Sequence, residues 1–199
     1  MCKGVIAGLM LAAGESRRMG EDKALLEYHH QPFLEVILEN LRQAGISRRV
    51  VVLGHHAAVI QNAVSFGDAR VVINQDYRLG QTSSLQTGLR ALDAPDVDGV
   101  LLCLVDHPAA GLEAMRQILE AFLRTSAPVV VPVYQGRRGH PVLLGRALFA
   151  ELLALDSQQG ANTVVRRYRE ATECVTVNDP GVALDIDEPG DYQDLIRGE

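Results

Sequence analysis

A basic, glycine-containing loop near the N-terminus is the first segment that could carry chemistry. It reads LAAGESRRMGEDK, from Leu11 to Lys23, and directly follows an apolar run. Gly14 and Gly20 permit close approach of the backbone, so amide groups there can point at phosphate oxygens. Arg18 and Lys23 can neutralise a triphosphate and the charge on a departing pyrophosphate. The spacing matches neither the P-loop nor GxGxxG, and the structural alternative is a glycine turn with solvated basic residues.

Two other segments contain aspartates whose carboxylates could bind a metal ion. Asp106, in VDHP, directly follows the apolar run Gly99–Val105, so it is expected at the carboxyl end of a buried strand. In LDIDEPGDY, Asp185 and Asp187 would face the same side of an extended segment. Mg²⁺ prefers oxygen ligands and commonly binds one or two carboxylates together with phosphates. We therefore predict a magnesium site at Asp106 and Asp187, with Asp185 as the alternative second carboxylate; turn or helix-cap roles are the structural alternatives.

The segment GQTSSLQTGL could bind another part of the same ligand. Gly80 ends a loop, and Ser84 lies at the start of an expected helix. Free amides at such a helix start can bind a phosphate or a base carbonyl. Capping of the helix by the Ser and Thr hydroxyls is an equally weighted alternative.

The histidines give weaker signals. His140, between Gly139 and Pro141, projects an imidazole from a constrained bend, but a lone histidine is more often structural. The adjacent pairs His29–His30 and His55–His56 lack metal-ligand spacing and are predicted to be surface or loop residues. The sequence shows no Ser-His-Asp order, no zinc pattern and no covalent nucleophile.

Short β-rich runs alternating with helical patterns must position these residues. Strands are predicted at Val5–Ala12, Arg49–Leu53, Arg70–Ile73, Gly99–Val105, Pro128–Val133 and Glu173–Val177. Helices are predicted at Pro32–Ala44, Ser83–Leu92, Gly111–Thr125, Gly145–Leu155, Ala161–Tyr168 and Pro189–Ile196. Pro132 indicates an edge or a bend in its strand. The alternation predicts an α/β fold with a mostly parallel central sheet, helices on both faces and ligands at the carboxyl ends of the strands.

The bulk composition limits the classes of partner. The 199 residues are 47% hydrophobic and 22% charged, which fits one globular domain, 1–199, with a small lid or insertion at 135–160. A net charge of −6 argues against general nucleic-acid binding. No apolar run approaches the ~18 residues of a membrane span, and the apolar N-terminal run predicts a first strand rather than a signal peptide. Cys2, Cys103 and Cys174 are odd in number and widely separated, which predicts free thiols in a reducing cytoplasm.

Taken together, LAAGESRRMGEDK, GQTSSLQTGL, VDHP, GHPVLL and LDIDEPGDY resemble the motifs of the MobA-like NTP transferases, in the same order. The similarity covers nearly the whole chain and is closest to the molybdenum cofactor cytidylyltransferases. It implies a three-layer Rossmann-like domain that joins CMP from CTP to the terminal phosphate of molybdopterin cofactor, with Mg²⁺ as cofactor and pyrophosphate as product. CTP or GTP and molybdopterin cofactor are then the substrates, and a client molybdoenzyme or its maturation factor is a candidate partner.

The resemblance also implies roles for individual residues. Triphosphate binding carries over to the first loop, at Leu11, Ala12, Ala13, Gly14, Arg18 and Lys23. Gly80 and Ser84 match positions used for the base and ribose, while Asp106 matches the metal-binding aspartate and Asp187 the second acidic position. Arg18, Lys23 and Asp106 are the expected catalytic residues, and His140 belongs to a stretch that faces the acceptor. LAAG, in place of the LAGG of guanylyltransferases, favours cytosine.

One departure and three alternatives accompany this resemblance. SQQGAN, Ser157–Asn162, stands where the cytidylyltransferase branch often has GDxGAR, which bears on the acceptor more than on the nucleotide; Arg166 or Arg167 could supply the lost cation. The first alternative is a guanylyltransferase, or another cytidylyltransferase with a phosphorylated acceptor. The second is an NADPH-dependent oxidoreductase, against which the lack of GxGxxG counts. The third is a non-catalytic carrier of molybdenum cofactor, against which the paired carboxylates count.

Overall fold

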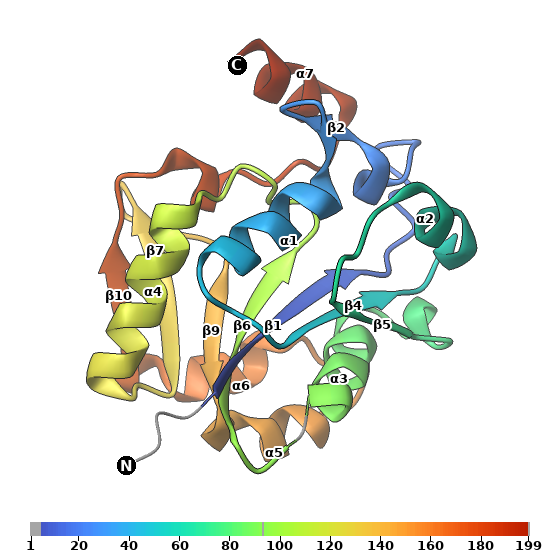
Figure 1. Cartoon of the computed structure of the whole chain (residues 1–199). Coiled ribbons are helices and arrows are strands. Elements are labelled where there is room, and N and C mark those ends of the chain that lie inside the picture. The colour runs from blue at the N-terminus through green and yellow to red at the C-terminus, as the bar shows by residue number, and fades with distance from the viewer. Residues whose placement is uncertain (1–4, 93, 199) are drawn as a thin grey trace.

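The computed structural model describes residues 5–92 and 94–198 and is built around one central sheet (Figure 1). Across the sheet the strands are β10 (Thr172–Thr176), β7 (Val129–Tyr134), β9 (Val142–Gly145), β6 (Val97–Leu104), β1 (Val5–Ala12), β4 (Arg49–Leu53) and β5 (Arg70–Ile73), with β8 (Arg137–Arg138) paired to β7. Neighbours pair in parallel except at β8 and β9, which are antiparallel to theirs. The predicted mostly parallel α/β sheet is confirmed.

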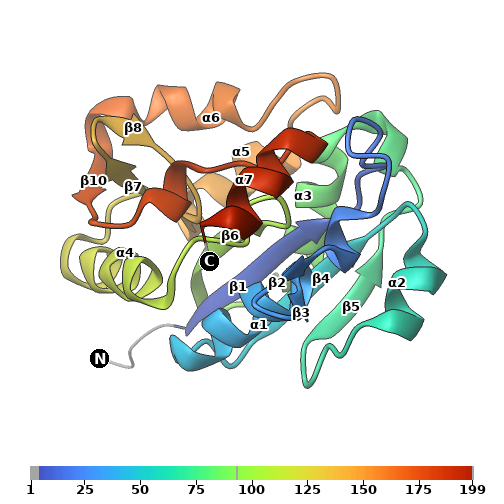
Figure 2. The ribbon, with the colours of Figure 1, turned by 90° about the horizontal axis from the view of Figure 1, so that it is seen from above.

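Helices cover both faces of this sheet (Figure 2). On one side lie α1 (Phe33–Gln43), α4 (Leu112–Thr125) and α2 (Ala57–Ala63), and on the other α3 (Gln81–Leu92), α5 (Phe149–Leu153) and α6 (Asn162–Arg167). The last helix, α7 (Pro189–Arg197), packs near the hairpin of β2 (Glu27–Tyr28) and β3 (Gln31–Pro32). Short 3₁₀ turns are η1 (Lys23–Leu25), η2 (Tyr77–Leu79), η3 (Arg146–Leu148), η4 (Arg169–Ala171) and η5 (Pro180–Ala183).

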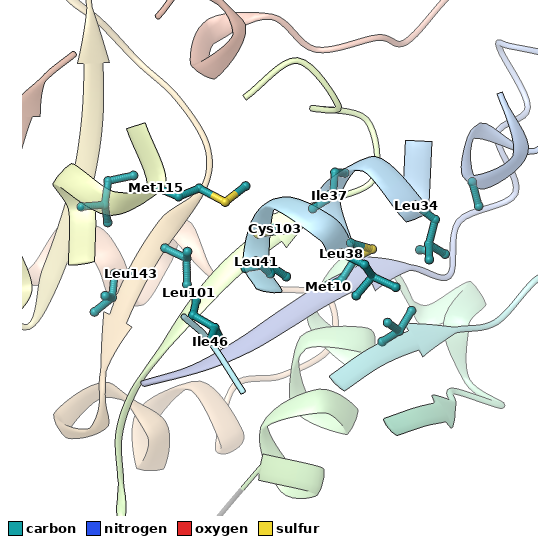
Figure 3. Close-up of a cluster of buried hydrophobic side chains, with 14 of the residues drawn as sticks. Met10, Leu34, Ile37, Leu38, Leu41, Ile46, Leu101, Cys103, Met115 and Leu143 are labelled. Carbon is teal, nitrogen blue, oxygen red and sulfur yellow. The ribbon is translucent and has the colours of Figure 1, made fainter. Parts of the chain in front are cut away.

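The core is divided by the sheet because side chains alternate along each strand. On β1, Met10 belongs to the cluster beneath α1 and α4, whereas Leu9 belongs to the cluster beneath α3. The α1 contribution comes from Leu34, Ile37 and Leu41, whose three- and four-residue spacing places them on one face of the helix (Figure 3). Burying both faces holds β1 rigidly, and β1 leads directly into the predicted phosphate loop.

The prediction of an edge or bend at Pro132 is wrong as to the edge, because β7 lies between β10 and β9. The carbonyl of Pro132 accepts a hydrogen bond from Gly139 at 3.0 Å, so its missing N–H faces the same side. On that side β9 pairs as far as Val130 and β8 pairs from Val133 onwards. Pro132 therefore lies where the partner of β7 on this side changes from β9 to β8.

Several predicted boundaries differ from the observed ones by one or more residues, and several short elements were not predicted. The helix predicted from Ser83 begins at Gln81, and the helix predicted at Gly145–Leu155 is η3 followed by the short α5. The unpredicted elements are the helix α2, the strands β2, β3, β8 and β9, and the 3₁₀ turns η1, η2, η4 and η5. Residues 135–160 contain β8, β9, η3 and α5, so β9 of this segment lies within the sheet.

The predictions about membrane spans and about the cysteines can also be compared with the structure. Among the described residues no helix is long and apolar enough to cross a bilayer. Cys103 and Cys174 are unpaired, and burial raises the pKa of the Cys103 thiol to about 12. Cys2 lies outside the described residues.

Candidate active site

The first loop leaves β1 with its backbone turned towards open space. A Cβ atom at Gly14 would meet no atom of the described residues within 4 Å, so this position is open to an approaching ligand. Further along, Gly20 and Ser16 adopt positive φ angles, and Gly20 N donates to Ser16 O. The Ser16 hydroxyl then accepts from Lys23 N at 3.1 Å. The loop is folded back on itself, which returns Lys23 to the carboxyl end of β1.

Two cations of this loop converge on one carboxylate from the C-terminal segment. Lys23 Nζ lies 2.6 Å from Asp187 Oδ1, and Arg18 Nη2 lies 2.6 Å from Asp187 Oδ2. Lys23 is chiefly responsible for holding the pKa of the Asp187 carboxyl below its usual value. The Lys23 side chain is buried, whereas Arg18 is 63% exposed and free to turn towards an incoming anion. A triphosphate would compete with Asp187 for both cations.

The start of α7 sets the position of Asp187. Asp191 accepts hydrogen bonds from the backbone N–H groups of Asp187 and Glu188 at 2.9 and 2.8 Å. Pro189 occupies the first turn, as expected for a helix start. Pro189 and Asp191 thus have structural roles at the start of this helix, and Asp191 holds the backbone of Asp187 at the mouth of the site.

Asp106 follows β6 and contributes a second carboxylate beside Lys23. Its Oδ2 lies 3.6 Å from Lys23 Nζ. Its Oδ1 is buried and has no hydrogen-bond partner within residues 5–92 and 94–198. A buried carboxylate oxygen without a partner is unusual, because its lost hydration is not compensated. A bound cation or a ligand hydroxyl would satisfy it.

Two histidines lie behind Asp106. The His107 and His140 ring centroids are 4.9 Å apart, and the Nδ1 atoms of both are buried and unpartnered within the described chain. Burial lowers the pKa of His107 and lowers that of His140 to about 4, so both imidazoles are neutral near pH 7. The predicted bend at His140 contains a cis bond to Pro141. Its imidazole lies beside His107 rather than in the main cleft.

The start of α3 forms the opposite end of the site. Ser83 donates to the backbone oxygens of Gly80 and Asp76, so its hydroxyl has the structural role that was weighed for this segment. The neighbouring Ser84 accepts from Asn74 at 3.0 Å and lines the cleft. Gly80 has a φ of 106°, a conformation that favours glycine.

These segments surround one cleft of about 340 Å³. Its lining includes the predicted residues Leu11, Ala12, Ala13, Gly14, Arg18, Lys23, Gly80, Ser84, Asp106 and Asp187. Of the predicted site residues, His140 is the one outside it, and the alternative carboxylate Asp185 is outside it as well.

Sequence reasoning missed five polar residues of the cleft wall. Four of them belong to the motifs of the first loop and of the start of α3, although their own side chains were not predicted to bind: Ser16, Arg17, Asp22 and Gln81. Tyr77 lies in the segment that follows β5, and no motif marked it. The position of that segment, beyond the carboxyl end of a parallel strand, was the available signal.

A family model described as the MobA-like NTP transferase domain matches residues 8–172. This span contains the first loop, the start of α3, Asp106 and His140 in the order in which the motifs were found. The chain belongs to the MobA-like NTP transferase family. The nucleotide transfer expected from the motifs is therefore confirmed at the level of the family.

Relatives within and near this family carry several names. The molybdenum cofactor guanylyltransferase of Xanthomonas euvesicatoria pv. vesicatoria is 54% identical over 87% of this chain and 89% of its own. The molybdenum cofactor cytidylyltransferase of Escherichia coli is 24% identical over 92% of each chain. The nicotine blue oxidoreductase of Paenarthrobacter nicotinovorans is 26% identical, also over 92% of each chain.

A solved structure supports both the fold and the use of a divalent cation. Rv0371c from Mycobacterium tuberculosis H37Rv superposes with a TM-score of 0.85 at 31% identity, covering 98% of each chain. Its complex with manganese superposes with a TM-score of 0.83 at 30% identity, over 98% of this chain and 100% of that one. The Rossmann-like nucleotidyltransferase fold is confirmed, and a structure of the same fold binds a divalent metal.

Proposed function

We propose that this MobA-like NTP transferase transfers CMP from CTP to molybdopterin cofactor and releases pyrophosphate, in a reaction that depends on Mg²⁺. The observation that carries the proposal is the convergence of Lys23, Arg18 and two carboxylates in one cleft with the open glycine loop. Opposite charges gathered in this way suit a ligand that is itself a polyanion accompanied by a cation. We take residues 1–199 as one catalytic domain.

In the proposed complex the first loop binds the triphosphate. The backbone at Ala13 and Gly14 approaches the phosphates closely, because no atom of residues 5–92 or 94–198 occupies the space where a Gly14 Cβ would lie. Lys23 and Arg18 exchange Asp187 for phosphate oxygens and neutralise the charge that develops on pyrophosphate. Gly80 and Ser84, at the other end of the cleft, contact the nucleoside.

The residues present fit a magnesium ion. Asp106 Oδ1 is a buried carboxylate oxygen that has no hydrogen-bond partner among the described residues, and Asp187 provides a second carboxylate in the same cleft once Lys23 turns to phosphate. Both offer the hard oxygen ligands that Mg²⁺ takes together with phosphates. When bound, Mg²⁺ would neutralise phosphate charge and help to orient the reacting groups.

The proposed reaction is an in-line displacement at the α-phosphorus of CTP. A terminal phosphate oxygen of the acceptor forms the new P–O bond, and the bond to the bridging oxygen of pyrophosphate breaks. Because the acceptor phosphate is already ionised, no proton need be removed and no protein nucleophile is required. Lys23 and Arg18 contribute by positioning and by charge neutralisation, and the cleft walls exclude water.

A guanylyltransferase is the second candidate, favoured by the 54% identity to the Xanthomonas enzyme of that name. The sequence LAAG at Leu11–Gly14 is the feature on which the preference for cytosine rests. The same residues would perform the same displacement with GTP, so only the base contacts near Ser84 and Gly80 would differ.

The test is a pyrophosphate-release assay with purified protein, molybdopterin cofactor, Mg²⁺ and either CTP or GTP, with calorimetric binding of CTP, GTP and NADPH alongside. We expect CTP to be preferred at least tenfold in kcat/KM. Preference for GTP would replace the base assignment. Binding of NADPH alone, or binding of pterin without any transfer, would overturn the proposal in favour of an oxidoreductase or a carrier.

The matched variants are Asp106→Asn and Asp98→Asn, two aspartates near opposite ends of β6. Asp106→Asn should lower kcat by about 100-fold or more, because the carboxylate is lost where charge must be balanced. Asp98 is exposed and lies outside the cleft, so its variant should retain full activity. Circular dichroism of both variants verifies the fold, and wild-type turnover by Asp106→Asn would remove that residue from the mechanism.

A further inference from the structure

Two histidines and an aspartate lie close together beside the cleft, and the aspartate, Asp22, is part of the cleft lining. Asp22 closes the first loop, and His55 and His56 follow β4. Because β1 and β4 are adjacent parallel strands, the segments after their carboxyl ends meet. One potential ligand atom from each of Asp22, His55 and His56 lies within 4.8 Å of the other two.

The backbone is bent to bring these side chains together. His56 has φ 48° and ψ 27°, a left-handed conformation that costs free energy in a residue other than glycine. In this position His56 Nδ1 lies 2.9 Å from Asp22 Oδ2, and its ring stacks on that of His55 with centroids 3.7 Å apart. Gly54 is equally constrained, since a Cβ there would lie 2.6 Å from Tyr77 and 2.8 Å from Ala13 O.

Tyr77 provides a support of the kind that metal-binding histidines usually have. Its hydroxyl lies 3.3 Å from His55 Nδ1, which leaves the other ring nitrogen of His55 for a ligand. A hydrogen bond to one ring nitrogen fixes the orientation of a histidine that binds metal through the other. A simple Asp22–His56 hydrogen bond is the alternative explanation of this cluster. It would not account for the contact between Tyr77 and His55, nor for the stacking of the His55 ring on His56.

We propose that Asp22, His55 and His56 form a binding site for a borderline divalent cation of the Zn²⁺ type, distinct from the magnesium position at Asp106. Two imidazoles and one carboxylate are the ligand set of open zinc sites, with further positions left for water or an anion. Mg²⁺ takes oxygen ligands and disfavours such a set. Because Asp22 also lines the cleft, the cation would fasten the first loop to the start of α2.

The experiment measures metal binding by tag-free protein and needs no nucleotide or activity, so it is independent of the proposed function. Co²⁺ is titrated and its visible d–d absorption recorded, and Zn²⁺ affinity is measured by competition with a chromogenic chelator in excess Mg²⁺. Wild type should bind Zn²⁺ at this site with Mg²⁺ present. His56→Asn and Asp22→Asn should each weaken that binding by about tenfold or more. Loss of a residue that only supports a metal ligand already lowers metal affinity by about that factor, and loss of a ligand itself should cost at least as much.

The chain offers a matched control. His30 is exposed and also has a positive φ of 60°, and asparagine tolerates that conformation, so His30→Asn repeats the substitution outside the cluster. His30→Asn and Asp106→Asn should both bind Zn²⁺ as wild type does. Equal affinity in wild type, His56→Asn and Asp22→Asn would overturn the proposal, and so would complete displacement of Zn²⁺ by Mg²⁺ or loss of the Zn²⁺ equivalent in Asp106→Asn.

Discussion

At the scale of single residues, Lys23 carries more of the proposed chemistry than any other cation. It is one of only two lysines in the sequence, the other being Lys3, although Lys and Arg together number 19. A lysine presents a compact point charge, which can lie between two carboxylates and still follow a phosphate. Lys23 does so with Asp187 at 2.6 Å and Asp106 at 3.6 Å.

Replacing Lys23 with Met should therefore lower kcat/KM for nucleotide transfer by about 100-fold, since one cation that balances the leaving pyrophosphate is lost. The pKa of the Asp187 carboxyl should also rise towards its usual value, because Lys23 is the main cause of its depression. Steady-state kinetics measures the first effect, and NMR titration of labelled aspartate measures the second.

Arg42→Met is the control for this variant, because Arg42 is an exposed cation on α1 that pairs with Glu39 away from the cleft. Its kinetics should match those of wild type. If Lys23→Met also keeps wild-type kcat/KM, the phosphate-binding role of the first loop is wrong. An unchanged Asp187 pKa would contradict the charge arrangement independently of activity.

Residues of the cleft could be predicted wherever a motif directly followed a buried strand. Asp106 and Gly14 are examples, since the end of an apolar run fixes their place at the carboxyl edge of the sheet. The group of Asp22 with His55 and His56 could not be predicted in this way. Its contacts join two loops 33 residues apart, and they depend on a left-handed backbone at His56 that no spacing rule reveals.

At the scale of the elements, α3 must lie close to the sheet because it carries the nucleoside end of the cleft. Gly88 allows this approach, since a Cβ there would lie 2.3 Å from Leu9 Cδ1 and 3.0 Å from Val52 Cγ2. Gly190, in α7, is the opposite case, because a Cβ there would meet nothing within 4 Å in the part of the chain that the structure describes. Alanine substitutions at these two glycines therefore distinguish the effect of helix propensity from the effect of close packing.

Gly88→Ala should lower the free energy of unfolding by about 1–2 kcal/mol, because overpacking outweighs the gain in helix propensity. Gly190→Ala should raise it by up to about 1 kcal/mol, since only the propensity changes. Urea denaturation monitored by circular dichroism measures both. Equal shifts in the two variants would mean that α3 does not depend on close packing against β1 and β4.

The elements themselves were predictable in proportion to their length and regularity. The long helices α1 and α4 repeat apolar residues at helical spacing and were predicted nearly to their ends. The strand β9 is only four residues long and pairs antiparallel with β6. Such a strand is specified by distant partners rather than by its own sequence, and the Gly139–Pro141 bend before it suggested a loop.

At the scale of the whole molecule, the buried histidines behind Asp106 make stability depend on pH. Burial lowers the pKa of His140 to about 4, whereas an unfolded chain has a histidine pKa near 6.5. Between these values the unfolded state binds more protons than the folded state, so stability rises with pH across this window and is lost as pH falls through it. His107 acts in the same direction, since burial lowers its pKa as well.

The free energy of unfolding of wild type should therefore fall by about 2–3 kcal/mol more between pH 7 and pH 4 than that of His140→Gln, which keeps a polar side chain but cannot be protonated. Urea denaturation at a series of pH values measures the slope for each protein. His30→Gln removes an exposed histidine and should keep the wild-type slope. If the slopes of wild type and His140→Gln coincide, the His140 imidazole is solvated in the native protein.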